Sequence, residues 1–437
     1  MSADPLGGDG YGYCPAADPI GEIVIVNDFA AAQGGATAVA LLETRELRQR
    51  GYKVTFISGG HPSAELDRLG VAQVALGMAS LLEQPVLRAM AQGVHNASAA
   101  RMISQWIARH DTPHTVYHLH NWSQILSPAV FAALRPVEQR LVVTCHDFFN
   151  LCPNGGLTHY NTSRPCTARP LSVQCLASQC DRRNPAQKYW RTLRQLRLNA
   201  SAGFRDSQAT FTFLHDRMQA RFVEGGFAAD DLVTVPNPVE AWTEYRIEAE
   251  ANQGFLFVGR VGRDKGADLA IRAARVSGQK LTIVGTGEID QSLHQGDCDV
   301  HFAGWRDRAE IAVLARQARA LIVPSRVVEP FGLVLLEAAM SGLPVIVSSH
   351  AYLASEASEL GFAQAFDIDR DDALPGLLAR FARDDTLFAR MSRAGFEHAG
   401  GLCHSPPSWA EQLIRIFRAK LPVVDREIGA TPVKDRS

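Results

Sequence analysis

Residues 319–348 read RALIVPSRVVEPFGLVLLEAAMSGLPVIVS. Two short apolar runs, Ala320 to Val323 and Pro344 to Val347, flank a segment whose apolar residues recur at helical spacing after Gly332. The order strand, loop, helix, strand is typical of an open parallel sheet, and such sheets bind ligands at the carboxyl ends of their strands. The stretch therefore predicts an α/β domain with a site in the loop after its first strand.

Two carboxylates belong to this stretch, Glu329 before the predicted helix and Glu337 within it. At a rise of about 1.5 Å per residue they lie roughly 10 Å apart, at or beyond the separations of about 5 to 9.5 Å used by paired glycosidase carboxylates. Two contacts with one long ligand fit this spacing better than one acid–base pair. The structural alternative is a carboxylate near a helix N-terminus and a solvated helix residue.

Length and composition indicate a soluble protein with two domains. The chain has 437 residues, of which 46% are hydrophobic and 21% charged, and its net charge of −2 gives no basis for nucleic-acid binding. Residues 1–20 lack the basic and apolar regions of a secretory signal and are predicted to be a disordered leader. No apolar run is long enough to span a membrane. We therefore expect a cytoplasmic protein, with any membrane contact peripheral.

Two series of strands alternate with helices and define the predicted domains. The first domain comprises residues 21–242, with a helix at 36–50, helical sequence at 84–109, and strands at 22–27, 53–58, 115–119, 141–145 and 210–213. An acidic linker at 243–254 follows. The second domain comprises residues 255–405, with strands at 255–258, 281–284, 300–303, 320–323 and 345–348 and helices at 371–383 and 385–399. A last helix is expected within 406–422, before a flexible tail at 423–437.

In each predicted domain, a glycine-containing loop follows the first strand. Gly34 and Gly35 precede a helix, whose N-terminus presents unpaired backbone N–H groups to an anion. In GRVGRDKG, Gly259 allows close approach of a ligand, while Arg260 and Lys265 could neutralise a diphosphate. Tight turns and solvated loop cations are the structural alternatives.

The ordered set of motifs resembles the retaining glycosyltransferases of family 4. It consists of GRVGRDKG, VGTG at 284–287, EPFGLVLLE at 329–337, the Gly34–Gly35 loop and TCHDFFNLCPNGG at 144–156. The resemblance covers roughly residues 22–421. It implies a GT-B fold, in which two Rossmann-like, doubly wound domains face each other across a cleft, and a last helix that crosses back to the first domain.

The resemblance also implies roles for individual residues. Arg260 and Lys265 would hold the donor diphosphate, Glu329 would contact the donor sugar, and Glu337 would bind the ribose. His146 would lie beside the anomeric centre, so that the implied catalytic residues are His146, Arg260, Lys265 and Glu329. The implied donor-binding residues are Gly34, Gly35, Gly259, Arg260, Lys265, Gly285, Glu329, Pro330, Phe331, Gly332, Leu333 and Glu337.

Three further residues are candidates for the acceptor side. His118 and His120 alternate along a predicted strand and so point to one face. Asp147 could orient His146 or cap a turn. For each histidine a hydrogen-bonded structural role is the alternative.

Four cysteines are concentrated in the insertion at residues 152–180, namely Cys152, Cys166, Cys175 and Cys180. Their spacing lacks a C-x2-C pair, so structural zinc, reduced structural thiols and a redox role all remain open, with thiols favoured. The insertion is expected to shape the acceptor side. Behind it, residues 182–205 carry Arg191, Arg194 and Arg197 among apolar residues, which fits either an ordinary surface helix or contact with an anionic membrane.

These observations predict a retaining, metal-independent glycosyltransferase. It would move a hexose-type sugar from a nucleoside diphosphate sugar to a saccharide or lipid-linked saccharide, without a cofactor, and the family suggests surface polysaccharide or glycoconjugate synthesis. The alternatives are an inactive nucleotide-sugar-binding partner of the same fold and a nucleotide-sugar epimerase. The sequence does not identify the base, the sugar, the acceptor, the linkage or the oligomeric state.

Overall fold

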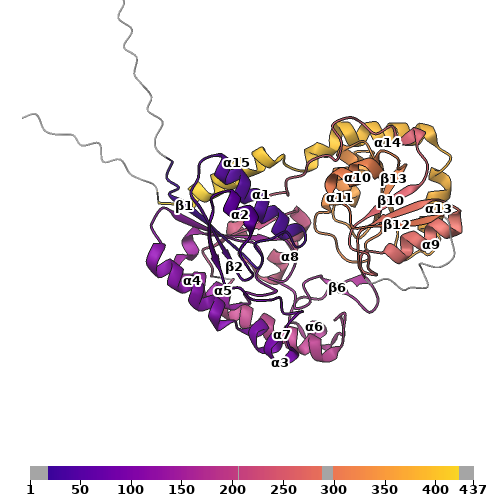
Figure 1. Cartoon of the computed structure of the whole chain (residues 1–437). Helices are drawn as coiled ribbons and strands as arrows, with labels where there is room; N and C mark the ends of the chain where they lie inside the picture. Colours follow the sequence, from indigo (N-terminus) through magenta and orange to yellow (C-terminus); the bar gives the residue numbers. More distant parts are fainter. Residues whose placement is uncertain (1–17, 205, 288–298, 423–437) are drawn as a thin grey trace, which may run out of the picture.

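The computed structural model describes residues 18–204, 206–287 and 299–422. They form two α/β domains that lie side by side, each built around its own sheet (Figure 1). The predicted leader lies outside the described residues as far as residue 17, as does the predicted tail at 423–437. The prediction of two doubly wound α/β domains is confirmed.

The first domain contains a seven-stranded parallel sheet in the order β3-β2-β1-β4-β5-β8-β9. Ile23 and Ile25 of β1 belong to one buried cluster, while Val24 and Val26 belong to the other, so both faces of the sheet are covered. Its strands are β1 (Glu22–Asn27), β2 (Val54–Ser58), β3 (Ala72–Ala75), β4 (Thr115–Leu119), β5 (Leu141–Cys145), β8 (Thr210–Phe213) and β9 (Leu232–Thr234). Its helices are α1 (Gly35–Gln49), α2 (Ala64–Arg68), α3 (Val86–Val94), α4 (Ala97–His110), α5 (Ala129–Leu134), α6 (Val173–Ala177), α7 (Pro185–Ala202) and α8 (Asp216–Gly225).

The second domain contains a six-stranded parallel sheet in the order β12-β11-β10-β13-β14-β15. Its strands are β10 (Phe255–Val258), β11 (Leu281–Val284), β12 (Val300–Gly304), β13 (Ala320–Val323), β14 (Val345–Ser348) and β15 (Ala363–Phe366). Its helices are α9 (Ala267–Ser277), α10 (Arg308–Ala315), α11 (Leu333–Met340), α12 (Ala354–Glu359), α13 (Ala373–Phe381) and α14 (Asp385–His398). The stretch at 319–348 thus forms β13, α11 and β14, as its pattern predicts.

The structure differs from the predicted elements in the helical sequence at 84–109, at three edge strands, and in the cysteine insertion, where β6 (Thr158–His159) and β7 (Arg164–Pro165) form a two-stranded sheet. The helical sequence at 84–109 forms two helices, α3 and α4, because Asn96 leaves helical geometry and its side chain accepts a hydrogen bond from the backbone N–H of Ala99 at 3.2 Å. The strands β3, β9 and β15, absent from the prediction, all lie at sheet edges. Edge strands are short and partly exposed, so they lack the continuous apolar run of a central strand.

The chain connects the two domains twice. The first connection, residues 243–254, includes a 3-10 turn (Ala249–Ala251). Its Ile247 is buried, and the backbone N–H of Ile247 donates to the carbonyl oxygen of Ser341 in the second domain at 2.8 Å. At the other crossing, α15 (Pro406–Ala419) packs against α1 of the first domain. Figure 1 shows it as the yellow helix above α1 and α2, and its Phe417 ring lies 5.4 Å from the ring of His118.

Candidate active site

A cavity of about 400 Å³ lies between the domains, at the carboxyl ends of strands from both sheets. Both domains contribute to its wall, and the sequence predicts many of the residues that line it. These residues are Gly35, His146, Asp147, Gly259, Lys265, Glu329, Pro330, Phe331, Gly332 and Leu333. The structure therefore brings together, from positions almost 300 residues apart, most of the residues that the motifs singled out.

Two helix N-termini open into this cavity, that of α1 at Gly35 and that of α11 at Leu333. Neither has a side-chain cap or an acidic residue in its first turn, so the first N–H groups of each helix are available to a ligand. Gly34 makes this possible at α1 because its φ of 82° lies in the left-handed region. The two helix dipoles together favour a negatively charged ligand.

Lys265 supplies a side-chain cation to the same wall. Its Nζ lies 2.5 Å from Oε2 of Glu329, and Ser325 Oγ donates to the same carboxylate oxygen at 3.2 Å. Both charged groups are partly exposed to the cavity, with 31% and 18% of their side-chain surfaces accessible. An anionic ligand can therefore replace Glu329 as the partner of Lys265.

Four predicted donor-binding residues do not line the cavity. Gly34 caps α1, and the Arg260 guanidinium pairs with Asp264. Gly285 lies behind Gly259, where a Cβ would meet the Gly259 carbonyl oxygen at 1.9 Å at a φ of +131°. Glu337 accepts a hydrogen bond from Arg308 at 2.7 Å, and burial raises its pKa against the effect of that arginine. Direct contact of Arg260 or Glu337 with a ligand stays a prediction.

Behind the cavity, a buried chain of hydrogen bonds runs from α1 through β4 to His146. Glu43 Oε1 lies 2.8 Å from His118 Nδ1, and Glu43 Oε2 lies 2.7 Å from His120 Nε2. His120 Nδ1 lies 2.9 Å from His146 Nε2, and the hydroxyl of Thr144 lies 2.7 Å from His118 Nε2. His118 and His120 are thus fully buried behind the wall, and only His146 reaches the cavity.

The protonation states of Glu43 and His120, which belong to this chain of hydrogen bonds, determine the tautomer of His146. Burial alone would raise the pKa of Glu43, but His118 and His120 lower it to about 2, so the carboxylate is anionic and accepts from both rings. Burial and His118 lower the pKa of His120 to about 4, which leaves this ring neutral with its lone pair on Nδ1. Burial, followed by His120, holds the pKa of His146 well below its usual value. His146 therefore donates from Nε2 and keeps Nδ1 as an acceptor.

Glu43, His118 and His120 also form the one group of potential metal ligands that lie within 4.8 Å of each other in the described ranges. Both carboxylate oxygens and all four ring nitrogens are already engaged in the hydrogen bonds given above. The group fits a positioning network better than a metal site.

The cysteine insertion packs around a lysine. Lys188 is 2% exposed, and its Nζ donates to the sulfurs of Cys180 at 3.0 Å and Cys175 at 3.6 Å. Burial raises the pKa of the Cys152 thiol to about 11, and its Sγ donates to Asn154 at 3.2 Å. Within the described residues, no three of the four cysteine sulfurs come within 4.8 Å of one another. The contacts of Cys175 and Cys180 with Lys188 fit the predicted reduced structural thiols, and structural zinc at Cys152, Cys166, Cys175 and Cys180 stays a prediction.

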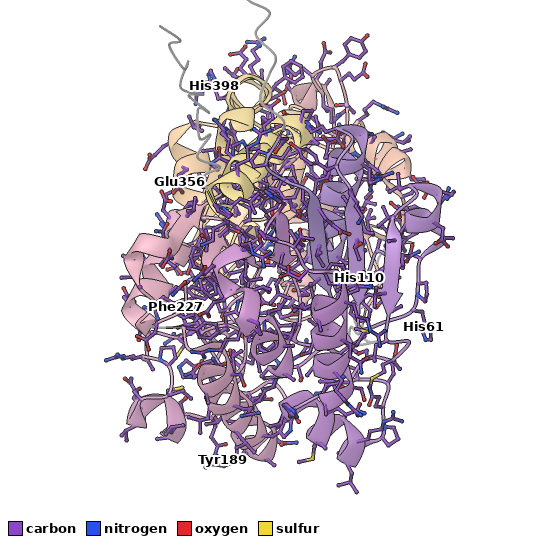
Figure 2. The ribbon with its side chains drawn as sticks, turned by 90° about the vertical axis from the view of Figure 1, so that its left-hand side faces the viewer. His61, His110, Tyr189, Phe227, Glu356 and His398 are labelled. Carbon is purple, nitrogen blue, oxygen red and sulfur yellow. The ribbon has the colours of Figure 1, made fainter. Side chains whose placement is uncertain are left out.

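The arginines of residues 182–205 do not form the exposed basic face that their spacing predicts. Within α7, Arg194 is 7% exposed and Arg191 pairs with Asp181 at 3.1 Å, so only Arg197 of the three points into solvent. The exposed face of α7 is instead largely apolar, with Tyr189, Leu193 and Leu196. Figure 2 shows Tyr189 pointing outward at the lower end of the molecule.

Sequence reasoning missed several residues of the site. Asn121, Leu214, Asn237 and Ser325 line the cavity but lie in loops without a recognisable pattern. The sequence does contain a pattern that indicates burial of Glu43. Ala40, Glu43, Thr44 and Leu47 follow the helical spacing i, i+3, i+4, i+7, and all four are buried on the inner face of α1.

Family models match most of the chain in two adjacent parts. Residues 33–242 match "Glycosyltransferase Family 4", and residues 243–398 match "Glycosyl transferases group 1". The boundary between the two matches falls at the start of the predicted linker.

Curated relatives match shorter stretches. The chain is 32% identical over 203 residues to the D-inositol 3-phosphate glycosyltransferase of Mycobacteroides abscessus, which is 43% of this chain and 44% of that protein. It is 39% identical over 105 residues to the glycogen synthase of Mycobacterium tuberculosis, which is 22% of this chain and 25% of that protein. The matched stretches thus span less than half of these relatives.

Solved structures of similar fold match nearly the whole chain. The sucrose-phosphate synthase of Thermosynechococcus elongatus has a TM-score of 0.66 at 18% identity and covers 91% of this chain and 98% of its own. Anabaena Alr3699/HepE, solved in complex with UDP-glucose, has a TM-score of 0.61 at 16% identity and covers 91% and 99%. These likenesses confirm the GT-B fold.

Proposed function

The chain belongs to the group 1 glycosyltransferases, and we propose that it transfers a sugar from a nucleoside diphosphate sugar to a saccharide or glycolipid, with retention at the anomeric carbon. The observation that carries this proposal is the cavity wall formed by Lys265 and the two uncapped helix N-termini. Together they provide a cation and two sets of N–H donors where a diphosphate would lie. That the fold-related HepE was solved with UDP-glucose agrees with such a donor.

The reaction requires stabilisation of a leaving diphosphate. The bond between the anomeric carbon and the phosphate oxygen breaks, and the diphosphate leaves with the electron pair. The acceptor hydroxyl oxygen bonds the anomeric carbon, and its proton passes to the departing phosphate oxygen. Lys265 and the N–H groups of α1 and α11 act where the negative charge develops, which is the arrangement most effective for catalysis.

His146 and Glu329 have complementary roles toward the sugar. Burial keeps His146 neutral by lowering its pKa, and the hydrogen-bond chain leaves Nδ1 as an acceptor for a sugar hydroxyl. Glu329 exchanges its contact with Lys265 for the sugar hydroxyls once the diphosphate binds Lys265. A donor hydroxyl hydrogen-bonded on both sides is held in one orientation, which favours a single reaction geometry.

We propose that transfer needs neither a divalent metal nor a cofactor. The Asp-x-Asp triplets in the described part of the chain, at 367–369 and 369–371, follow β15 and do not line the cavity. Lys265 and the helix N-termini supply the charge compensation that a metal ion would otherwise give.

The proposed setting is the synthesis of a surface polysaccharide or glycoconjugate at the inner face of a membrane. Within the described residues, no helix has the length and apolarity needed to cross a bilayer. The exposed apolar face of α7 offers a peripheral contact instead.

A thermal-shift panel tests the donor proposal. UDP, GDP, ADP and their sugars are added to the protein with EDTA and then with Mg²⁺. One nucleotide should raise the apparent melting temperature selectively and equally in both conditions, because a ligand that binds only the folded state stabilises it. A shift seen only with Mg²⁺ would contradict metal independence, and no shift with any of them would contradict a nucleoside diphosphate sugar as the donor.

A further inference from the structure

A second cavity, of about 370 Å³, lies in the first domain between α3, α7 and the loop after β4. Asn121 and Asp147 line both this cavity and the donor cavity, so the two meet at these residues. A molecule in the second cavity can therefore reach the wall of the donor cavity at these two residues.

The second cavity has a strong excess of positive charge. Arg183, Arg191 and Arg194 line it, and Asp147 is the one acidic residue in its lining. Arg191 already pairs with Asp181, but Arg183 is exposed and has no carboxylate partner among the described residues. The cavity is thus suited to an anionic ligand.

Arg194 is the most deeply buried of these cations. It is 93% buried, its Nη2 donates to the carbonyl oxygen of Ser123 at 2.6 Å, and its guanidinium lies 4.9 Å from the Trp122 ring centroid. Its Nε is buried without a hydrogen-bond partner. Burial lowers its pKa to about 10, so it remains charged at neutral pH. A buried donor without a partner is unfavourable unless a ligand supplies the acceptor.

The mouth of this cavity is apolar. Leu82, Val86 and Met90 line it and are 71%, 72% and 44% exposed. Leu87 on α3 and Leu193 on α7, the two helices beside the cavity, are also exposed apolar side chains. Figure 1 shows α3, α6 and α7 together at the lower end of the first domain. Exposed apolar side chains gathered around a charged cavity are typical of a site for an amphiphile.

We propose that the second cavity binds the acceptor, and that the acceptor is a saccharide joined through a phosphate or diphosphate to a lipid. The inference rests on the proposed function. The saccharide end lies at Asn121 and Asp147, the phosphate lies on the arginines, and the lipid lies along the apolar mouth. Burial raises the pKa of Asp147 to about 6, so above that pH its carboxylate accepts a hydrogen bond from the acceptor hydroxyl and orients it toward the donor.

The probe for this site is geranyl diphosphate, compared with inorganic diphosphate and with geraniol. Calorimetry should show that geranyl diphosphate binds at least tenfold more tightly than either, because only this ligand has both parts. Arg183→Ala should weaken its binding by about tenfold or more. Arg197→Ala on α7, which removes the same charge outside the cavity, should change it less than twofold.

Two further comparisons separate this inference from the proposed function. Lys265→Ala, which removes the cation of the donor cavity, should leave geranyl diphosphate binding unchanged, and Arg183→Ala should leave nucleotide binding unchanged. Equal losses in the Arg183 and Arg197 variants, or binding no tighter than that of inorganic diphosphate, would overturn the lipid-phosphate site. If nucleotides still shift the melting temperature in that case, the proposed function stands without it.

Discussion

Replacing Lys265 by Ala should weaken binding of the nucleoside diphosphate by about 1.5–3 kcal/mol, the contribution of a charged hydrogen bond. It should also lower kcat/KM for transfer by roughly 10²- to 10³-fold, because the same group stabilises charge as the diphosphate leaves. Lys265 lies in the cavity wall, and its salt bridge within the described residues is with Glu329. Calorimetry with the nucleotide, followed by steady-state kinetics, measures both effects.

The matched control is Lys280→Ala. Lys280 is exposed in the same domain and does not line the cavity, so its loss changes the net charge equally but should leave nucleotide affinity unchanged. An unchanged affinity in the Lys265 variant would remove this residue from the donor site.

Replacing Glu43 by Gln should lower the free energy of unfolding by about 3 kcal/mol at pH 7. Burial would raise the pKa of Glu43, but His118 and His120 lower it to about 2, below the ordinary value of a glutamate, and a shift of one unit corresponds to about 1.4 kcal/mol. A carboxyl group whose pKa is lower in the folded state than in the unfolded state stabilises the fold at pH values above its unfolded pKa. The contribution should therefore be complete at neutral pH and disappear as the pH falls from about 4.5 through about 2.

The same substitution should change the tautomer of His146. A Gln side chain has one acceptor oxygen and an NH2 group that can only donate, so His118 and His120 cannot donate to its two ends as they donate to the two carboxylate oxygens. Nitrogen NMR of the His146 ring should show the proton on Nε2 in the wild type and a changed tautomer population in the variant, with a loss of kcat.

Glu65→Gln is the control for this experiment. Glu65 lies on α2 and pairs with Arg45 at 3.3 Å with 34% of its side chain exposed, so its loss should change stability by less than about 1 kcal/mol. If both variants have equal stability and His146 keeps its tautomer, the hydrogen-bond chain does not position this residue.

The sequence predicts the central part of each sheet because central strands are buried on both faces. Runs such as 141–145 and 320–323 consist almost entirely of apolar residues for that reason. The edge strands β3, β9 and β15 carry partly exposed residues and give no such run. The break between α3 and α4 depends on a single capping residue, Asn96, inside otherwise helical sequence.

The donor cavity is predictable to the extent that it is built from backbone and motif residues. Loops that follow β1 and β5 lie at one edge of the first sheet, and loops that follow β10 and β13 lie at one edge of the second, because parallel strands place their carboxyl ends on the same edge. The two edges face each other across the cavity. The sequence does not predict which polar side chains point into the protein, because tertiary packing decides this. The arginine spacing on α7 indicates a basic surface, yet Trp122, Phe149 and Trp190 hold Arg194 inside.

The measurement that tests the account most directly is a crystal structure with the nucleoside diphosphate that gives the largest thermal shift. We predict that the diphosphate lies in the cavity between the domains, within hydrogen-bond distance of Lys265 Nζ and the Gly35 N–H, with the Lys265–Glu329 contact replaced. A nucleotide bound elsewhere, with that contact intact, would contradict the assignment of the donor site.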